Sequence, residues 1–346
     1  MKVSRRLTIG VALLAAGGVA ALGALVGNGQ AAHTAGVKVA VVADTGSLND
    51  KGFNTLAVQG LTKAEKVLGV DGRVYPTATA ADRAPNLQAA AQAGYGLVIA
   101  NGVLFAFGPL NTVAPQFPKV KFAGTDVNYG DVQGAPPNVR GIQFREQEAG
   151  CLVGNIAALQ AKHEHDKVIS ALGANKVPAI VRYFAGYNYC AKRAYPKIQV
   201  LNNYANDPTF EDQAKCKAST LGQIARHAKI VFMVAGSCGL GGLDAVKRAG
   251  VWGIGVDADQ YFLGSFILTS AVKHVEISTY DTIQQYVKDP SGFKTGFNAN
   301  YTLKNGGVGY GRLSSKLPKA WQKVLKKSTD KLEKLIISGK VKPPAQ

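Results

Sequence analysis

The sequence contains none of the short motifs that mark common catalytic centres. It has no Walker phosphate loop, no Gly-x-Ser-x-Gly nucleophile elbow and no His-Glu-x-x-His pair. The glycine-rich turn at residues 236–242, GSCGLGG, departs from the dinucleotide fingerprint, because the position that requires Gly or Ala is Asp244. A carboxylate there would repel a phosphate. Hydrolase, nucleotidase and oxidoreductase functions therefore have little support.

Charged residues are also scarce, at 18% of the 346 residues, whereas 47% are hydrophobic. This balance argues against extended disorder, and the length leaves room for two domains with full cores. The formal net charge is nonetheless +18; removing Lys2, Arg5 and Arg6, which belong to a predicted export signal, leaves +15.

Basic residues gather only towards the end of the chain, where a helix is predicted from residue 317 onwards. They are Lys316, Lys319, Lys323, Lys326, Lys327, Lys331 and Lys334. Their spacing favours a solvated helix face, so no nucleic-acid partner is expected. Binding of DNA through this tail is the alternative.

Cysteine is rare, and none precedes Cys151. In an exported protein the four cysteines, Cys151, Cys190, Cys216 and Cys238, predict two disulfides with three alternative pairings. We favour Cys190 with Cys216, because they lie on successive predicted helices of neighbouring β-α units, which leaves Cys151 for Cys238. No Cys-x-x-Cys pair is present, so no metal site is expected.

Residues 1–31 have the parts of an export signal: a basic start, an uncharged apolar span at 7–26, and small residues suited to cleavage. Ser4, Arg5 and Arg6 give a partial twin-arginine pattern. An uncleaved membrane anchor is the alternative, since the span is long enough to cross a bilayer. With no cysteine near the cleavage region, the sequence predicts an exported, non-lipidated protein in the periplasm or at the extracellular face of the plasma membrane.

Residues 37–61, VKVAVVADTGSLNDKGFNTLAVQGL, predict a buried strand, a polar loop and a helix. The same alternation recurs to residue 146 and restarts after it, which predicts an α/β protein with two parallel sheets. Further strands are predicted at 73–75, 96–101, 120–124, 139–144, 168–172, 198–203, 230–234, 251–256 and 265–269. Helices are predicted at 85–93, 105–117, 146–161, 187–195, 211–227, 241–249 and 272–287.

Acidic residues follow three of the predicted strands, at Asp44, Asp126 and Asp257. The carboxyl ends of parallel strands are where open α/β sheets bind ligands, and carboxylates can accept two hydroxyl groups of a sugar. Phe53 and Phe210 are core residues by default, but their polar neighbours indicate that both face a cleft.

Several segments, in the same order, resemble the basic membrane protein (BMP, or PnrA-like) family of substrate-binding proteins of ABC transporters. They are DTGSLNDKGFNTLAVQGL, FAFGPLNTVAPQFPKVKFAGTD, FREQEAGCLVGNIAAL, AGSCGLGGLDAVKRAGVWGIGVDADQ and LTSAVKH. The resemblance implies a type I periplasmic-binding-protein fold with two doubly wound lobes and a hinge. We place the N-terminal lobe at 37–146 plus 272–304 and the C-terminal lobe at 147–271 plus 305–346.

The resemblance further implies a non-catalytic receptor that delivers a purine nucleoside to an ABC transporter permease, without a cofactor. Phe53 and Phe210 would sandwich the base. Asp44, Asn54 and Asp126 would contact the base edge or hold the ligand on the first lobe. Asp257 and Lys273 would hold the ribose, and the turn at Gly236 would let the backbone approach.

Two differences from the family bear on the ligand and on membrane contact. Members are usually lipoproteins, whereas contact here would run through the permease or an uncleaved N-terminal anchor. Gly52 stands where many members have Ser, and Phe210 lies in Asp-Pro-Thr-Phe rather than Gly-Ser-Phe. A flavin or sugar is therefore the alternative solute, and a nucleoside-cleaving enzyme is the alternative from another class.

Overall fold

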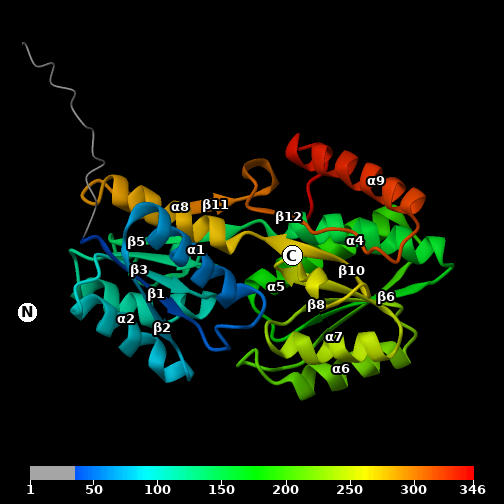
Figure 1. Ribbon diagram of the computed structural model, residues 1–346, viewed down its shortest axis with the longest axis horizontal. Coiled ribbons are helices and arrows are strands. Elements are labelled where there is room, and N and C mark those ends of the chain that lie inside the picture. The colour runs from blue at the N-terminus through cyan, green and yellow to red at the C-terminus, as the bar shows by residue number, and fades with distance from the viewer. Residues whose placement is uncertain (1–35) are drawn as a thin grey trace, which may run out of the picture. The chain divides into compact units, whose positions relative to one another are not determined.

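The computed structural model describes residues 36–346 and contains two six-stranded sheets (Figure 1). The export signal predicted at residues 1–31 lies outside the described residues. Within residues 36–346, no helix has both the length and the apolar character needed to span a bilayer.

The first sheet has the strand order β11-β5-β4-β3-β1-β2, and all neighbouring strands are parallel. Its strands are β1 (Lys38–Ala43), β2 (Asp71–Pro76), β3 (Leu97–Asn101), β4 (Lys121–Thr125), β5 (Val139–Phe144) and β11 (Asn298–Tyr301). We call this sheet with its covering helices the first lobe.

The second sheet has the order β12-β10-β9-β8-β6-β7 and is parallel except for β12, which runs antiparallel to β10 at the edge. Its strands are β6 (Val168–Gly173), β7 (Gln199–Tyr204), β8 (Ile230–Val234), β9 (Trp252–Asp257), β10 (Ile267–Lys273) and β12 (Val308–Tyr310). This sheet and its helices form the second lobe.

Helices cover both faces of each sheet, which explains why the central strands are apolar without alternation. In β1, Val39 and Val41 pack on the face covered by α1 (Phe53–Leu68) and α8 (Val275–Lys288). Ala40 and Val42 pack on the other face, under α2 (Arg83–Gln92) and α3 (Pro109–Val113). The predicted α/β architecture with doubly wound parallel sheets is confirmed.

The second lobe is built in the same way. Ile169 and Phe232 face α4 (Glu146–His163) and α5 (Pro178–Ala194), whereas Leu172 and Met233 face α6 (Gln213–Ala225) and α7 (Cys238–Arg248). The last helix, α9 (Lys319–Ile337), packs against α4 (Figure 1).

The predicted disulfide pairing is wrong. Cys151 is bonded to Cys190, with 4.9 Å between their Cα atoms, and Cys216 is bonded to Cys238, with 5.5 Å. Cys190 and Cys216 lie on opposite faces of the second sheet, because α5 covers one face and α6 the other. Each bond instead joins two helices that pack on the same face.

Helices α4 and α5 pack closely enough for a disulfide because glycines line their contact. A Cβ atom at Gly150 would collide with the carbonyl oxygen of Tyr183, and one at Gly154 with that of Tyr187. Cys151 stands beside this glycine seam and is completely buried. Gly150 and Gly154 therefore allow α4 and α5 to approach closely enough for Cys151 and Cys190 to form a disulfide.

Several predicted boundaries differ from the structure. The helix predicted at 187–195 begins at Pro178, and the one predicted at 105–117 is broken into short pieces around α3. Val272 and Lys273, predicted to open a helix, end strand β10 instead. The short strands β11 and β12 were not predicted.

The chain crosses from one lobe to the other three times: between β5 and α4, between β10 and α8, and between β11 and β12. Glu146 and Lys273 therefore stand beside crossing points. The division into movable units at 37–146 plus 272–304 and 147–271 plus 305–346 stays a prediction.

Candidate functional site

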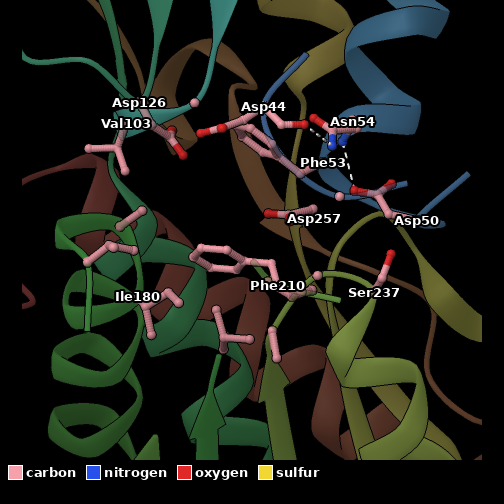
Figure 2. A pocket seen from close by; sticks show the side chains of 18 of the residues that line it. Asp44, Asp50, Phe53, Asn54, Val103, Asp126, Ile180, Phe210, Ser237 and Asp257 are labelled. Atoms are coloured by element: carbon pink, nitrogen blue, oxygen red, sulfur yellow. Dashed lines mark hydrogen bonds between the residues drawn. The ribbon is translucent and has the colours of Figure 1, made fainter. Parts of the chain in front are cut away.

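A pocket lies between the lobes, and all eight residues predicted to bind a ligand line it (Figure 2). They are Asp44, Phe53, Asn54, Asp126, Phe210, Gly236, Asp257 and Lys273. The cavity is small, about 100 Å³. The lining also includes residues that the sequence did not single out as ligand contacts, notably Ile180, Tyr183 and Ser237.

Asp50 shapes the loop that brings Phe53 to the pocket. Its carboxylate accepts hydrogen bonds from the backbone N–H groups of Gly52, Asn54 and Thr55, at 2.9, 2.9 and 3.1 Å. These donors belong to the first turn of α1, which has no side-chain cap from Gly52 itself. Phe53 is therefore fixed as the first residue of the helix.

Asn54 is held by its own lobe. Its side-chain amide donates to the carbonyl oxygen of Asp44 at 3.3 Å, and its side-chain oxygen accepts from Asn101 at 3.0 Å. Asn54 thus ties the ends of β1 and β3 to the start of α1.

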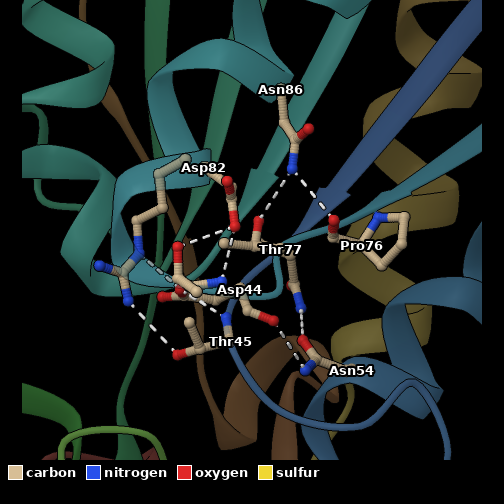
Figure 3. A network of polar contacts seen from close by, with 10 residues as sticks. Asp44, Thr45, Asn54, Pro76, Thr77, Asp82 and Asn86 are labelled. Atoms are coloured by element: carbon tan, nitrogen blue, oxygen red, sulfur yellow. Dashed lines mark hydrogen bonds and ion pairs between the residues drawn. The ribbon is translucent and has the colours of Figure 1, made fainter.

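Asp44 forms an ion pair with Arg83, a partner that the sequence did not reveal (Figure 3). The distance from Arg83 Nε to Asp44 Oδ1 is 2.6 Å, and the backbone N–H of Thr45 donates to the same oxygen at 2.7 Å. Burial raises the pKa of Asp44, and the Arg83 charge acts against that shift. The guanidinium occupies one carboxylate oxygen and orients the group.

Four charged side chains from both lobes form a largely buried chain that we call the ion-pair chain: Asp126, Lys273, Glu146 and the partly exposed Arg182. Lys273 Nζ lies 2.7 Å from Asp126 Oδ2 and 3.3 Å from Glu146 Oε1. Glu146 Oε2 lies 2.6 Å from Arg182 Nε. The Lys273 side chain is 2% exposed and Glu146 is fully buried.

Burial acts to lower the pKa of Lys273, but the charges of Asp126, Glu146 and Asp257 more than offset it and raise that pKa. Lys273 is therefore a charged ammonium. Its Nζ also lies 4.9 Å from the centre of the Phe53 ring. The sequence analysis did not identify Glu146 and Arg182 because both lie on helices. A buried lysine needs carboxylate partners, and this need was the signal that could have pointed to them.

The pKa of Asp257, at the end of β9, is strongly shifted from its ordinary value. Burial raises its pKa to about 7, although Lys273 acts in the opposite direction. Tyr183 donates a hydrogen bond from its hydroxyl to Asp257 Oδ1 at 3.3 Å. Asp257 can thus change its charge near neutral pH.

Three non-glycine residues of the pocket adopt left-handed backbone conformations. The φ angles are 63° at Asp126, 62° at Phe210 and 61° at Asp257. Such conformations are uncommon for residues with a Cβ atom, and they cluster at sites that position side chains for function. Asp126 directly follows β4 and Asp257 is the last residue of β9, so the chain turns sharply where each carboxylate enters the pocket.

Phe53 and Phe210 approach the cavity from opposite lobes, with Asp257 between their levels in Figure 2. The carbonyl oxygen of Phe210 accepts from the N–H of Cys238 at 2.8 Å. A Cβ atom at Gly236 would lie 3.3 Å from Phe210 Cβ, and its φ is +55°. Gly236 therefore lets the Phe210 loop pack closely against the turn that opens α7.

Two polar atoms of the pocket are buried without a hydrogen-bond partner among the described residues: Asp126 Oδ1 and Ser237 Oγ. Buried polar atoms are nearly always paired in folded proteins. A carboxylate oxygen can only accept, so a bound molecule with a hydroxyl or N–H group would complete Asp126.

The family model described as "ABC transporter substrate-binding protein PnrA-like" matches residues 37–346. This chain belongs to the PnrA-like (Bmp) family. It is 33% identical to an uncharacterized lipoprotein of Pyrococcus furiosus over 289 residues, 80% of this chain and 70% of that protein. It is 30% identical over 333 residues to the ABC transporter nucleoside-binding protein BmpA of Lactococcus lactis, 90% of each chain.

Solved structures agree. An ABC transporter solute-binding protein from Aeropyrum pernix superposes with a TM-score of 0.77 at 26% identity, covering 90% of this chain and 94% of that one. A glucose-galactose binding protein from Geobacillus stearothermophilus, at 14% identity and a TM-score of 0.58, shares the fold over 76% of this chain and 94% of its own. The PnrA-like chain is thus an extracytoplasmic solute-binding receptor of the type I periplasmic-binding fold and not an enzyme.

Besides the contact of Lys273 with Asp126, a hydrogen bond from Gln260 joins the lobes. Gln260, which is 4% exposed, donates from Nε2 to the carbonyl oxygen of Lys51 on the first lobe at 3.3 Å. Its Oε1 accepts from the N–H of Val256 on the second lobe at 3.2 Å. A single side chain therefore links the end of β9 to the loop before α1.

We predict that Gln260→Glu opens the ligand-free protein. A carboxylate keeps the acceptor for Val256 but loses the donor to Lys51, and one hydrogen bond shifts an equilibrium by about 2- to 10-fold. Single-molecule energy transfer between dyes on the two lobes should show the open fraction rise accordingly. Asn86→Asp is the matched control, since the Asn86 amide bonds only Pro76 and Thr77 of its own lobe. Equal open fractions in both variants would contradict the prediction.

Proposed function

We propose that the pocket binds a purine nucleoside and that the closed receptor presents it to an ABC transporter permease. The observation that carries this proposal is the pair of aromatic side chains, Phe53 and Phe210, that reach one cavity from opposite lobes. Two rings placed in this way suit a flat heterocycle, because offset stacking stabilises aromatic pairs. The name of the Lactococcus relative supports the same ligand class.

The charge of the pocket favours a nucleoside over a nucleotide. Four carboxylates line it, on Asp44, Asp50, Asp126 and Asp257, with the Lys273 ammonium as the one cation among the lining residues. A phosphate group would be repelled, whereas hydroxyl and N–H donors would be accepted. The unpaired Asp126 Oδ1 is the acceptor in greatest need of such a donor.

In this proposal the base lies between Phe53 and Phe210. Asp44 and Asp126 accept hydrogen bonds from donors on the ligand, and the Asn54 amide holds Asp44 through its backbone carbonyl. Asp257 and Lys273 face the ribose hydroxyls. The cavity of about 100 Å³ is below the ~300–1,000 Å³ of typical ligand pockets, so the lobes must move apart to admit a nucleoside.

We predict that adenosine, guanosine or inosine raises the melting temperature, because a ligand that binds only the folded protein stabilises it. Phe53→Ala should raise Kd about 5- to 100-fold in calorimetric titrations, since stacking of one base on an aromatic ring contributes ~1–3 kcal/mol. Phe297→Ala, at a 41% exposed ring outside the pocket lining, is the control.

The same titrations test the alternatives. Riboflavin and hexoses replace the nucleosides in one arm, and chromatography for free base checks for cleavage of the nucleoside in another. If no nucleoside at millimolar concentration shifts the melting temperature while a flavin or sugar does, the nucleoside proposal is wrong.

We also predict that affinity rises with pH around neutrality. Hydroxyl donors bind the ionised Asp257 better than the protonated form, and the pKa of Asp257 is about 7. Below that pH, a proton must leave before binding, so Kd should grow by up to about tenfold per pH unit. Asp257→Asn should bind more weakly and with a flat profile between pH 5 and 8; a parent profile that is equally flat would exclude this role.

We further propose that this receptor carries no N-terminal lipid, unlike the Pyrococcus relatives, which are named lipoproteins. All four cysteines of the sequence are committed to disulfides, so none of them offers a thiol for acylation. The intact mass of protein isolated from its native cells should equal that of the processed chain. A mass excess that corresponds to acyl chains would refute the proposal.

A further inference from the structure

Helix α9 has one face fixed to the protein and one face turned to solvent. Leu325, Thr329, Leu332 and Ile336 are buried along one side. The Trp321 ring stacks on His163 of α4 with 4.1 Å between ring centres, and its Nε1 donates to Gln160 at 2.6 Å. The helix is thereby held rigidly against α4 (Figure 1).

The opposite face carries five exposed lysines, which we call the lysine face: Lys319, Lys323, Lys327, Lys331 and Lys334. At 100° per residue they fall within one third of the helix circumference. Among residues 36–346 none of the five forms an ion pair; the sixth lysine of α9, Lys326, pairs with Asp330 at 2.7 Å. By the same count Asp330 also falls within this third of the circumference, but its carboxylate is paired with Lys326. The lysine face therefore keeps a strong net positive charge.

Positive charge is denser in α9 and its flanking residues than in the chain as a whole. Residues 316–342 hold nine lysines against Asp330 and Glu333, a net +7 in 27 residues of a protein with +18 overall. Such a density on a rigid helix complements a surface with many fixed negative charges.

We propose that the lysine face docks the receptor on a bilayer rich in anionic phospholipids. Each lysine held near such a surface strengthens binding about fivefold, and five lysines on one plane act together. Two exposed apolar side chains of the same helix, Val324 and Ile337, are 50% and 43% exposed. They can enter the interfacial region of the bilayer, where amphipathic helices gain from apolar contact.

The observations favour lipid over nucleic acid. The receptor is extracytoplasmic, so the membrane is the extended anionic surface next to its transporter, and apolar side chains contribute nothing to phosphate contacts. No residue of α9 lines the ligand pocket. Docking through α9 therefore leaves the pocket lining uncovered, and the receptor can bind solute while it is attached.

The test is sedimentation of the full chain with vesicles of phosphatidylcholine alone or with about 30% phosphatidylglycerol. We expect binding to the anionic vesicles only, and we expect it to fall steeply as NaCl rises from about 0.05 to 0.5 M. Absence of binding to anionic vesicles at low salt would overturn the proposal.

A matched pair of variants locates the surface. Lys323→Glu with Lys327→Glu and Lys331→Glu should weaken vesicle binding at least about 100-fold, since three factors of about five are lost before repulsion is counted. Lys66→Glu with Lys119→Glu and Lys294→Glu changes the net charge equally at exposed positions outside α9 and should change binding less than about twofold. An equal loss in both triple variants would show that only net charge matters and would refute a docking face.

Duplex DNA of the same charge concentration is the competing partner. The proposal requires tighter binding to anionic vesicles than to DNA at equal salt, and Val324→Ser should weaken vesicle binding while leaving DNA binding unchanged. Tighter binding to DNA, lost in the α9 triple variant, would assign the lysine face to nucleic acid instead. Unchanged melting curves of all variants confirm folding, because the substituted side chains are exposed.

Discussion

The arrangement of the receptor depends on the burial of one ammonium group, that of Lys273. A charge out of water is costly unless oppositely charged groups surround it, and here Asp126 and Glu146 do so at 2.7 and 3.3 Å. These partners come from the end of β4 in the first lobe and from the start of α4 beside a crossing of the chain. The requirement to neutralise Lys273 therefore brings residues of both lobes together at the pocket wall.

The same group explains the acidity of the pocket. The ion-pair chain continues from Glu146 to Arg182, which balances the second carboxylate, and leaves Asp257 without a close cation of its own. Asp257 is buried, and the Lys273 ammonium that acts on it is already in direct contact with Asp126 and Glu146. Burial is the main cause of its pKa near 7, and the neighbouring carboxylates, that of Asp126 first, add to the shift. The buried Oδ1 of Asp126 in turn lacks a hydrogen-bond donor among the described residues. In the proposed function, hydroxyl or N–H groups of the ligand supply the donor that Asp126 lacks.

Sequence alone could predict the features that repeat with a period or follow a local rule. The apolar strands β5 and β8 were predicted with their observed bounds, and the acidic strand ends Asp44, Asp126 and Asp257 do meet at one pocket. Partners distant in the chain were beyond it. Arg83, Glu146 and Arg182 have no local pattern, and the disulfides depended on which face of the second sheet each helix covers. Strands β11 and β12, four and three residues long, are too short for their alternation to be recognised.

Both disulfides reinforce the second lobe: Cys151–Cys190 joins α4 to α5 on one face of its sheet, and Cys216–Cys238 joins α6 to the start of α7 on the other. Among the described residues the first lobe has no such bond, and the chain has no further cysteine. Covalent closure of a loop removes entropy from the unfolded chain, so the two lobes resist local opening unequally. Amide hydrogen exchange would detect this inequality as faster opening of β1–β5. The lobe without disulfides is then the one that opens locally more often, and it is the lobe that carries Asp44 and Phe53.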